Sequence, residues 1–383
     1  MIYLDNAATT FPKPAAVTNA AANASRFFGA NPGRGGHRLS VRAGEEVFRC
    51  REKLSEMFSC EVERAVFTLN CTHSINTAVK GVLTRGDHVI ISSLEHNSVL
   101  RPLERLREKG VITYDAAFVE PKNSAATVKN FERLIRPNTK MIFCTYASNV
   151  FGTVLPVKEL SALCKRHGLL FGLDCAQSAG LFPVNMEKDG VDILCAPGHK
   201  GLFGPLGTGV LLFSKRTKIE SLLEGGTGSL SLNKSQPELY PDALESGTVN
   251  LPGIAGLSAG LDFISSVGGE RAIHEKEAEL VKILREDISS IKNVTVFDDM
   301  HGEVFAPVLS FTVKNVHSEK TAQSLDDMLV AVRAGYHCSY LAHTSRKTTQ
   351  LGTVRVSPGY FNSKKDVKYF AFCLNKIAMS SKI

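Results

Sequence analysis

The chain has 383 residues, of which 43% are hydrophobic and 22% are charged, and its formal net charge is +7. This length exceeds what one small core supports, so we expect one large domain and a smaller one. The basic residues are dispersed and form no stripe interleaved with aromatic residues, so we expect no nucleic-acid partner.

The nine cysteines are scattered, odd in number and never arranged as Cys-x-x-Cys. This usage argues against a disulfide framework and a zinc cluster, so we expect no metal and a reducing compartment. The opening residues lack the basic and long apolar regions of a secretion signal, and no stretch reaches the roughly 18 apolar residues of a membrane span. We therefore expect a cytoplasmic protein without a membrane partner.

Strand-like and helix-like patterns alternate up to about residue 220. The predicted strands are short, continuously apolar runs at 65–68, 89–92, 141–145, 169–174, 193–196 and 209–213. The predicted helices lie between them at 74–83, 100–109, 125–135 and 157–167. Continuous apolar strands are typical of a sheet covered by helices on both faces, so this pattern predicts a mostly parallel α/β sheet.

The pattern changes after Pro252. A long helical stretch over 253 to about 291 is followed by strand patterns at 294–297 and 307–313 and helical patterns at 319–329 and 364–379. This order predicts a small α+β domain. We expect a large α/β domain over 15–252 and a small α+β domain formed by 1–14 together with 253–383.

Two residues at predicted strand ends carry the strongest chemical signal. Lys200 follows the apolar run 191–195 and precedes a glycine-rich stretch, and Asp174 ends the preceding strand. A lysine held there is a candidate Schiff-base lysine, and an aspartate is the partner that a pyridinium nitrogen needs. Pyridoxal phosphate (PLP) requires both groups. Either residue alone is also compatible with an ordinary loop.

Polar residues follow the earlier strands as well. Thr72 and His73 come after the first predicted strand and open a helix, whose N-terminus suits a phosphate. His96 follows the second strand and Asn149 the third. Each residue has an alternative role as a helix cap, a surface histidine or a turn residue. Their joint position at successive strand ends, where open parallel sheets bind ligands, favours a cofactor site.

In combination, the motifs resemble the class V, fold-type I PLP enzymes, in the branch of cysteine desulfurases and selenocysteine lyases. The resemblance covers nearly the whole length. The matching runs are Tyr3-Leu-Asp-Asn-Ala-Ala-Thr-Thr10, Asn31-Pro-Gly-Arg-Gly-Gly-His37, Glu95-His96, Ser148-Asn149, Asp174-x-Ala-Gln177, Gly198-His-Lys200, Glu245-Ser-Gly-Thr248, Arg333-Ala-Gly-Tyr-His-Cys338 and Arg355-Val-Ser-Pro-Gly-Tyr-Phe-Asn362.

The resemblance implies a fold-type I transferase, with a mostly parallel central sheet and a smaller C-terminal α+β domain. It implies that Lys200 carries PLP and then moves the proton on the substrate Cα. Asp174 would pair with the pyridinium nitrogen and Gln177 with the ring 3-hydroxyl. His96 would stack over the ring and act as an acid or base.

The resemblance also implies which residues hold the phosphate of the cofactor. Thr72, His199 and the backbone around His73 would hold it. Thr248 would reach the phosphate of the neighbouring subunit's cofactor, which implies a homodimer. Many family members carry serine or threonine two residues before the histidine of the lysine motif, whereas this chain has Pro197, which has neither a hydroxyl nor a backbone N–H.

A further set of residues is expected to bind the substrate carboxylate. The resemblance implies that Arg355 binds it through its guanidinium fork. Asn149 would contact the same carboxylate or a substituent of the cofactor ring, and Asn31 is also assigned to substrate binding.

Cys338 decides which reaction is expected. The resemblance places it where the family carries the cysteine that forms a persulfide. His337 and Arg333 are near enough in sequence to lower the pKa of the thiol. The expected activity is conversion of L-cysteine to L-alanine with sulfur transfer to Cys338 and then to an acceptor protein. Otherwise, Cys338 is one of nine ordinary cysteines.

Three alternatives stay open. Selenocysteine lyase activity is compatible with the same residues even without Cys338, because selenolate leaves readily. Another enzyme of the same class, such as an aminotransferase, a kynureninase-like hydrolase or an epimerase, predicts no role for Cys338. A non-catalytic scaffold that binds a sulfur carrier predicts no PLP.

Overall fold

The large central sheet has seven strands. The structure is a computed structural model and describes residues 1–33, 35–297, 299 and 304–380, so Arg34 of the motif at 31–37 lies outside the described residues. The strand order is β2-β8-β7-β6-β5-β3-β4. Their bounds are β2 Ala65–Thr68, β3 His88–Ser92, β4 Thr113–Ala117, β5 Thr139–Thr145, β6 Leu170–Asp174, β7 Ile193–Pro197 and β8 Gly209–Phe213.

Strand β8 pairs antiparallel with β2 and β7, and the other neighbouring pairs are parallel. The mostly parallel α/β sheet is therefore confirmed. Successive residues of strand β7 pack on opposite faces of the sheet: Ile193 belongs to one apolar cluster and Leu194 to another. This two-sided burial explains the continuous apolar runs.

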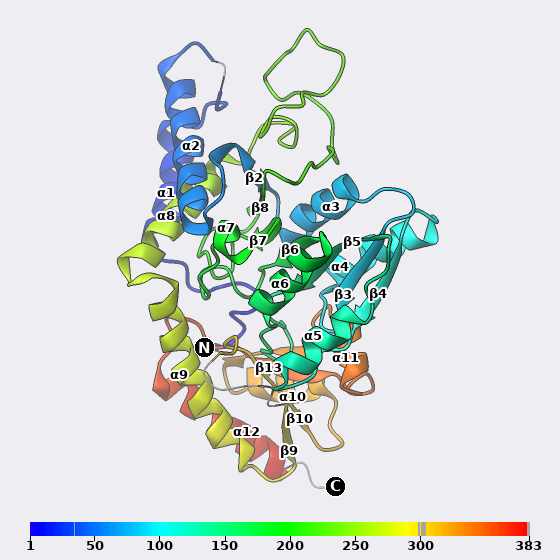
Figure 1. Cartoon of the computed structure of the whole chain (residues 1–383). Coiled ribbons are helices and arrows are strands. Elements are labelled where there is room, and N and C mark those ends of the chain that lie inside the picture. Colours follow the sequence, from blue (N-terminus) through cyan, green and yellow to red (C-terminus); the bar gives the residue numbers. More distant parts are fainter. Residues whose placement is uncertain (34, 298, 300–303, 381–383) are drawn as a thin grey trace.

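Helices cover both faces of this sheet (Figure 1). The helices that follow its strands are α3 Cys71–Val82, α4 Asn97–Glu108, α5 Ser124–Glu132, α6 Val157–His167 and the short α7 Met186–Asp189. Val79 and Leu103 of α3 and α4 pack in one of the two clusters, and Phe131 and Leu160 of α5 and α6 in the other.

Two helices near the N-terminus have no counterpart in the sequence-based assignment. They are α1 Ala15–Phe27 and α2 Arg38–Phe58. Helix α2 buries Ser40, Ala43, Val47, Cys50, Arg51, Leu54 and Phe58. This spacing of three and four residues is the helical period, so the signal was present in the sequence.

The single long helix predicted over 253–291 is wrong. Two helices, α8 Leu251–Ser266 and α9 Gly269–Ser289, meet at a bend of 77°. The break contains Gly268 and Gly269, with φ values of +100° and +82°, which a right-handed helix does not accommodate. Among the described residues, no one helix has the length and apolar character for a membrane span, and α8 with α9 meets that test as a bent pair.

The C-terminal part forms a second, antiparallel sheet with its own core. Its strand order is β12-β13-β10-β9, and α9 and α12 pack beside it. Strand β1 runs parallel to β11, so the N-terminus lies against this part (Figure 1). The remaining bounds are β1 Ile2–Tyr3, β9 Val294–Phe297, β10 Leu309–Val313, α10 Ser318–Asp326, β11 Val330–Ala331, β12 Arg333–Gly335, α11 Tyr340–Ser345, β13 Thr353–Val356 and α12 Lys364–Ser380.

Candidate active site

A cavity of about 240 Å³ opens at the carboxyl edge of the large sheet, between this sheet, the N-terminal arm and the C-terminal part. The structure brings most of the predicted site residues to it. The predicted residues that line the cavity are Thr72, His96, Asn149, Asp174, Gln177, His199, Lys200, Cys338 and Arg355. Three predicted residues, Asn31, His73 and Thr248, do not line it.

Lys200 and Asp174 face the same cavity from neighbouring strands. Asp174 is the last residue of β6 and is 1% exposed, and burial raises the pKa of its carboxyl. The Ala176 N–H donates to Asp174 Oδ1 at 2.8 Å. Burial, followed by the charge of Arg355, lowers the pKa of the Lys200 amine, and Asp174 partly offsets this. The lowered pKa favours a neutral, nucleophilic amine.

The N-terminal arm fixes the backbone that carries Lys200. Thr10 Oγ1 donates to the Lys200 carbonyl at 2.9 Å, and the Thr10 N–H donates to the His199 carbonyl at 3.2 Å. Lys13 Nζ donates to the same His199 carbonyl at 2.5 Å. The residues next to β1 therefore help to position the lysine.

Three histidines line the cavity, and burial leaves two of them, His96 and His199, uncharged at neutral pH. Burial, together with the charges of Lys200 and Arg355, lowers the pKa of His96 to about 4. Burial also lowers the pKa of His199 to about 4, and its Nδ1 lies 3.1 Å from Thr9 Oγ1. A neutral imidazole can stack on a flat ring or accept a proton.

Helix α3 points its N-terminus toward the cavity, as expected for a phosphate-binding site, but the Asn70 side chain already caps this N-terminus. Asn70 Oδ1 accepts the His73 N–H at 2.9 Å. An anion that took this N–H would displace the Asn70 side chain. Thr72 lines the cavity beside it, and Pro197 at the end of β7 offers no hydroxyl there. Asn70 is a site residue that sequence reasoning missed, although Asn before a helix is a common cap.

Arg355 lies on β13 and is 2% exposed. One of its terminal nitrogens donates to Asp5 Oδ1 at 2.7 Å and the other donates to the Asn149 carbonyl at 3.0 Å. Its Nε is buried and has no hydrogen-bond partner among the described residues. Because buried N–H groups are nearly always paired, this orphan donor fits an anionic oxygen from a ligand.

Cys338 is exposed, whereas Cys60 is half-buried and the other seven cysteines are buried. Hydrogen bonds on three consecutive residues hold its loop. Asn149 Nδ2 donates to the His337 carbonyl, the Asn97 N–H donates to the Cys338 carbonyl, and Ser339 Oγ donates to Asn149 Oδ1, each at 2.7 Å. The thiol is thus accessible on a backbone that is fixed at the cavity. Ser339 was missed by sequence reasoning.

The expectation that His337 lowers the pKa of the thiol is wrong. The His337 ring is buried, and its Nε2 lies 3.0 Å from Thr353 Oγ1. Burial lowers the pKa of His337 to about 2, so it carries no charge at neutral pH. Arg333 lines the cavity, but it also lies 3.8 Å from a carboxylate oxygen of Asp5.

Asn31 and Thr248 lie together in a different hollow, of about 800 Å³, between α2 and the segment 226–249. Both residues are exposed. This chain alone does not bring either of them to the cavity that contains Lys200.

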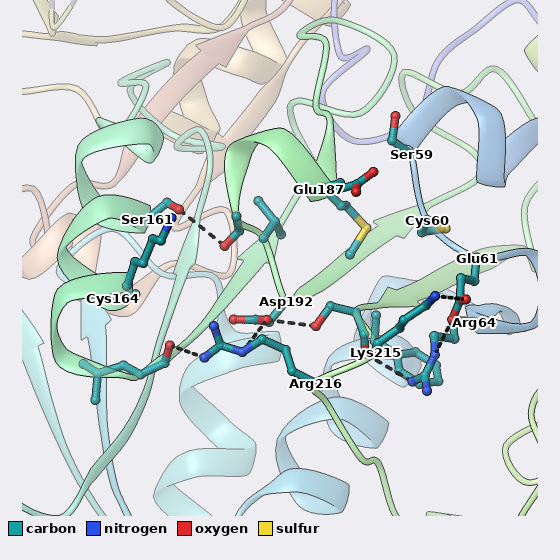
Figure 2. A pocket seen from close by; sticks show the side chains of 17 residues that line it. Ser59, Cys60, Glu61, Arg64, Ser161, Cys164, Glu187, Asp192, Lys215 and Arg216 are labelled. Carbon is teal, nitrogen blue, oxygen red and sulfur yellow. Dashed lines mark hydrogen bonds and ion pairs between the residues drawn. The ribbon is translucent and has the colours of Figure 1, made fainter.

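A third hollow, of about 760 Å³, lies at the opposite, amino edge of the sheet. Figure 2 shows that its charged side chains pair with one another: Lys215 with Glu61 at 2.7 Å and Arg216 with Asp192 at 3.2 Å. These ion pairs leave little unmatched charge for a ligand. In the described part of the chain, no group of three or more His, Cys, Asp or Glu residues is arranged to hold a metal ion.

The chain belongs to the class V aminotransferase family, whose model matches residues 2–370. This is a family of PLP enzymes. The chain is 33% identical to a "probable cysteine desulfurase" of Methanothermobacter thermautotrophicus, over 98% of this chain and 94% of that protein. It is 31% identical to a "probable cysteine desulfurase" of Pyrococcus abyssi, over 99% of this chain and 95% of that protein.

Solved structures agree with these relatives. The apo structure of a cysteine desulfurase from Thermococcus onnurineus matches with a TM-score of 0.92 and 31% identity, over 99% of this chain and 95% of that one. A cysteine desulfurase from Escherichia coli matches with a TM-score of 0.88 at 24% identity, over 100% of this chain and 95% of that one. At this low identity, the match supports the fold alone. The predicted family and fold are confirmed.

The residues at the cavity fit PLP. A buried amine at Lys200 and a buried carboxylate at Asp174 are the two groups that the aldehyde and the pyridinium nitrogen require. The orphan Nε of Arg355 fits the carboxylate of an amino-acid substrate. The individual roles of the other cavity residues stay predictions.

Proposed function

We propose that the protein is a PLP-dependent cysteine desulfurase, which converts L-cysteine to L-alanine and receives the sulfur on Cys338. The observation that carries the proposal is the convergence on one cavity of Lys200, Asp174 and Arg355 with an exposed cysteine. The names of the relatives support the same activity.

Substrate binding depends on Arg355 and Asn149. The buried Nε–H of Arg355 donates to the substrate carboxylate, and Asp5 holds the guanidinium in place. Asn149 Nδ2 has a second N–H beside the one given to His337, and this donor is available to the same carboxylate. Fixing the carboxylate directs the substrate amine toward Lys200 and its sulfur toward Cys338.

Proton movement at the substrate Cα depends on Lys200. PLP bound in this cavity supplies the electron sink that stabilises a carbanion at that carbon. Burial lowers the pKa of Lys200, which favours the neutral amine that can accept the Cα proton and return it. Asp174, at the carboxyl end of β6, would pair with the pyridinium nitrogen and so support the electron sink.

Sulfur transfer depends on Cys338. Its thiolate attacks the substrate sulfur, so an S–S bond forms while the Cβ–S bond breaks and leaves its electron pair on carbon. Protonation of that carbon gives L-alanine, and Cys338 holds the outer sulfur as a persulfide. The exposure of Cys338 allows a sulfur-acceptor protein or a thiol reductant to remove it.

The test is capture of the persulfide. Holoenzyme exposed briefly to L-cysteine is alkylated and digested, and mass spectrometry should find one extra sulfur on the Cys338 peptide and L-alanine in the medium. Absence of both products excludes the desulfurase and favours another enzyme of the class. A protein that takes up no PLP excludes enzymatic function through this site.

Cys338→Ala should lower the rate of sulfide release from L-cysteine by at least about 100-fold, because the nucleophile is gone. PLP uptake should not change, and turnover of L-selenocysteine should persist because selenolate leaves without help. Cys60→Ala, at the other edge of the sheet, is the matched control and should retain activity. Wild-type turnover of L-cysteine by Cys338→Ala would falsify the role of the thiol.

We further propose that the active form is a homodimer in which Thr248 contacts the cofactor phosphate of the partner subunit. The position of Thr248 outside its own cavity supports this, and so does the exposed surface of the segment 223–239. Its exposed leucines are Leu223, Leu230, Leu232 and Leu239. Large exposed apolar patches commonly mark interfaces.

Two further assignments belong to the same proposal. Nine unpaired cysteines support a reducing compartment, and we place the protein in the cytoplasm. We also propose the division into a large domain over 15–252 and a small one formed by 1–14 and 253–383. The separate apolar core beneath the second sheet supports this division into two domains. Helix α8 packs with the core of the large sheet, and these contacts support a boundary between the two domains near Gly268.

A further inference from the structure

The Cys338 loop is held in an unfavourable backbone conformation. His337 and Cys338 both have positive φ values, 47° and 56°, and neither residue is glycine. Two consecutive left-handed residues are costly and persist only where the surroundings enforce them. Since the Cys338 side chain is exposed, its own packing does not hold this conformation, and the buried His337 ring and the surrounding hydrogen bonds must.

Asn149 supplies two of these hydrogen bonds and also contacts the substrate-binding arginine. Its side chain donates to the His337 carbonyl and accepts from Ser339 Oγ, while its own carbonyl accepts from Arg355 at 3.0 Å. One residue of the turn that follows β5 thus connects the loop of the nucleophile to the arginine that binds the substrate carboxylate.

Ser339 completes this connection. It is 0% exposed, and its hydroxyl lies 2.7 Å from Asn149 Oδ1 and 3.3 Å from the His337 carbonyl. The His337 carbonyl can only accept and therefore takes the Asn149 amide nitrogen, while the Ser339 hydroxyl donates to the amide oxygen on the other side, so the two contacts together fix the rotation of the amide. The amide nitrogen is then directed at the His337 carbonyl.

We propose that Ser339 is a positioning residue that acts through Asn149 to fix the Cys338 thiol relative to the substrate carboxylate. This inference rests on the proposed desulfurase activity. A reacting atom misplaced by about 1 Å can cost about 100-fold in rate, so a loop held by a few hydrogen bonds is sensitive to the loss of one.

The first test is Ser339→Ala in the holoenzyme. We expect kcat for alanine formation from L-cysteine to fall about tenfold, while KM changes by less than about twofold because the contacts of Arg355 remain. Amide hydrogen exchange over residues 336–340 should accelerate about tenfold. Ser345→Ala is the matched control, since that hydroxyl bonds only to the Ala342 carbonyl of its own helix, α11.

The second test is a double-mutant cycle with Asn149→Ala. If Ser339 acts through Asn149, Ser339→Ala should change kcat by less than about twofold once Asn149 has been replaced. Equal effects of Ser339→Ala in both backgrounds would overturn the proposal. Unchanged kcat and unchanged exchange in the single variant would also overturn it.

A further variant guards against a misfolded Ser339→Ala protein. Asn149→Asp keeps the acceptor for Ser339 but removes the donor to the His337 carbonyl, so exchange over 336–340 should accelerate there too. Unchanged exchange in this variant contradicts the connection. Because exchange is measured without turnover, it tests the loop even if wild-type protein releases no sulfide from L-cysteine, a result that would refute the proposed activity instead.

Discussion

The buried Arg355 forms an ion pair with the partly exposed Asp5 of the N-terminal arm, 2.7 Å away. Their contact occupies one terminal nitrogen of the guanidinium and leaves its Nε without a partner among the described residues. A buried charge whose partner is removed is strongly destabilising, because no water replaces the lost contact. The pair therefore links substrate binding to the stability of the N-terminal arm.

Asp5→Asn should lower the free energy of unfolding by about 3 kcal/mol, as measured by urea denaturation. L-alanine, the product, should raise the melting temperature of this variant more than that of the wild type, because its carboxylate supplies the missing anion. Glu46→Gln removes the partner of the exposed Arg49 and should cost less than about 1 kcal/mol. Equal stabilities of the two variants would contradict a structural role for the pair.

The sequence was sufficient to predict that Asp174 and Lys200 meet at the cavity, because they follow apolar strands whose carboxyl ends lie together in a parallel sheet. It was not sufficient for the contacts of Asn149 with the Cys338 loop, 188 residues away along the chain. No local pattern encodes such a contact. Nor does a single chain reveal which subunit Thr248 serves.

Helix α9 contains a buried acid at its inner face. Glu277 is 7% exposed, burial raises its pKa to about 8, and its carboxyl accepts the Tyr360 N–H. Between about pH 4.5 and pH 8, the folded chain keeps a proton here that the unfolded chain has lost. The contribution of this group to stability therefore falls as the pH rises through that window.

Glu277→Gln should remove this dependence, because the amide stays uncharged and still accepts the Tyr360 N–H. Between pH 6 and pH 9, the wild type should lose at least about 1 kcal/mol of unfolding free energy relative to this variant, measured by urea denaturation at both pH values. Glu279→Gln, on the same helix at the exposed pair with Lys364, is the control. Parallel pH profiles of wild type and Glu277→Gln would show that Glu277 titrates normally.

The predicted elements were accurate where burial is two-sided and less so elsewhere. The bounds of β8 and α6 match the prediction, since apolar runs or clear helical periods define them. Strand β4 was missed because it lies at the sheet edge and is largely exposed or half-buried. The α8–α9 break was missed because a glycine pair inside an apolar stretch does not reveal its φ values.

At the scale of the whole molecule, subunit complementation tests the homodimer. Lys200→Ala and Thr248→Ala proteins are mixed 1:1, allowed to exchange subunits and assayed at limiting PLP. If Thr248 serves the partner's site, each mixed dimer contains one intact site, and the mixture should reach about a quarter of wild-type activity. Thr248→Ala alone should bind PLP about tenfold more weakly, because a phosphate contact is lost.

The control mixture is Lys200→Ala with Cys338→Ala. Both residues line one cavity of one chain, so mixed dimers have no intact site and activity should not return. Recovery by this control would mean that the thiol acts across subunits. No recovery in the first mixture would assign Thr248 to its own subunit or to no cofactor contact.

The pairing of β1 with β11 and of Asp5 with Arg355 has a consequence for biosynthesis. Residues 2–5 cannot make these contacts until residues 330–355 have been synthesised. A chain that ends before residue 330 therefore lacks both the strand that pairs with β1 and the arginine that binds the substrate carboxylate. We therefore expect the proposed sulfur transfer to become possible only late in translation.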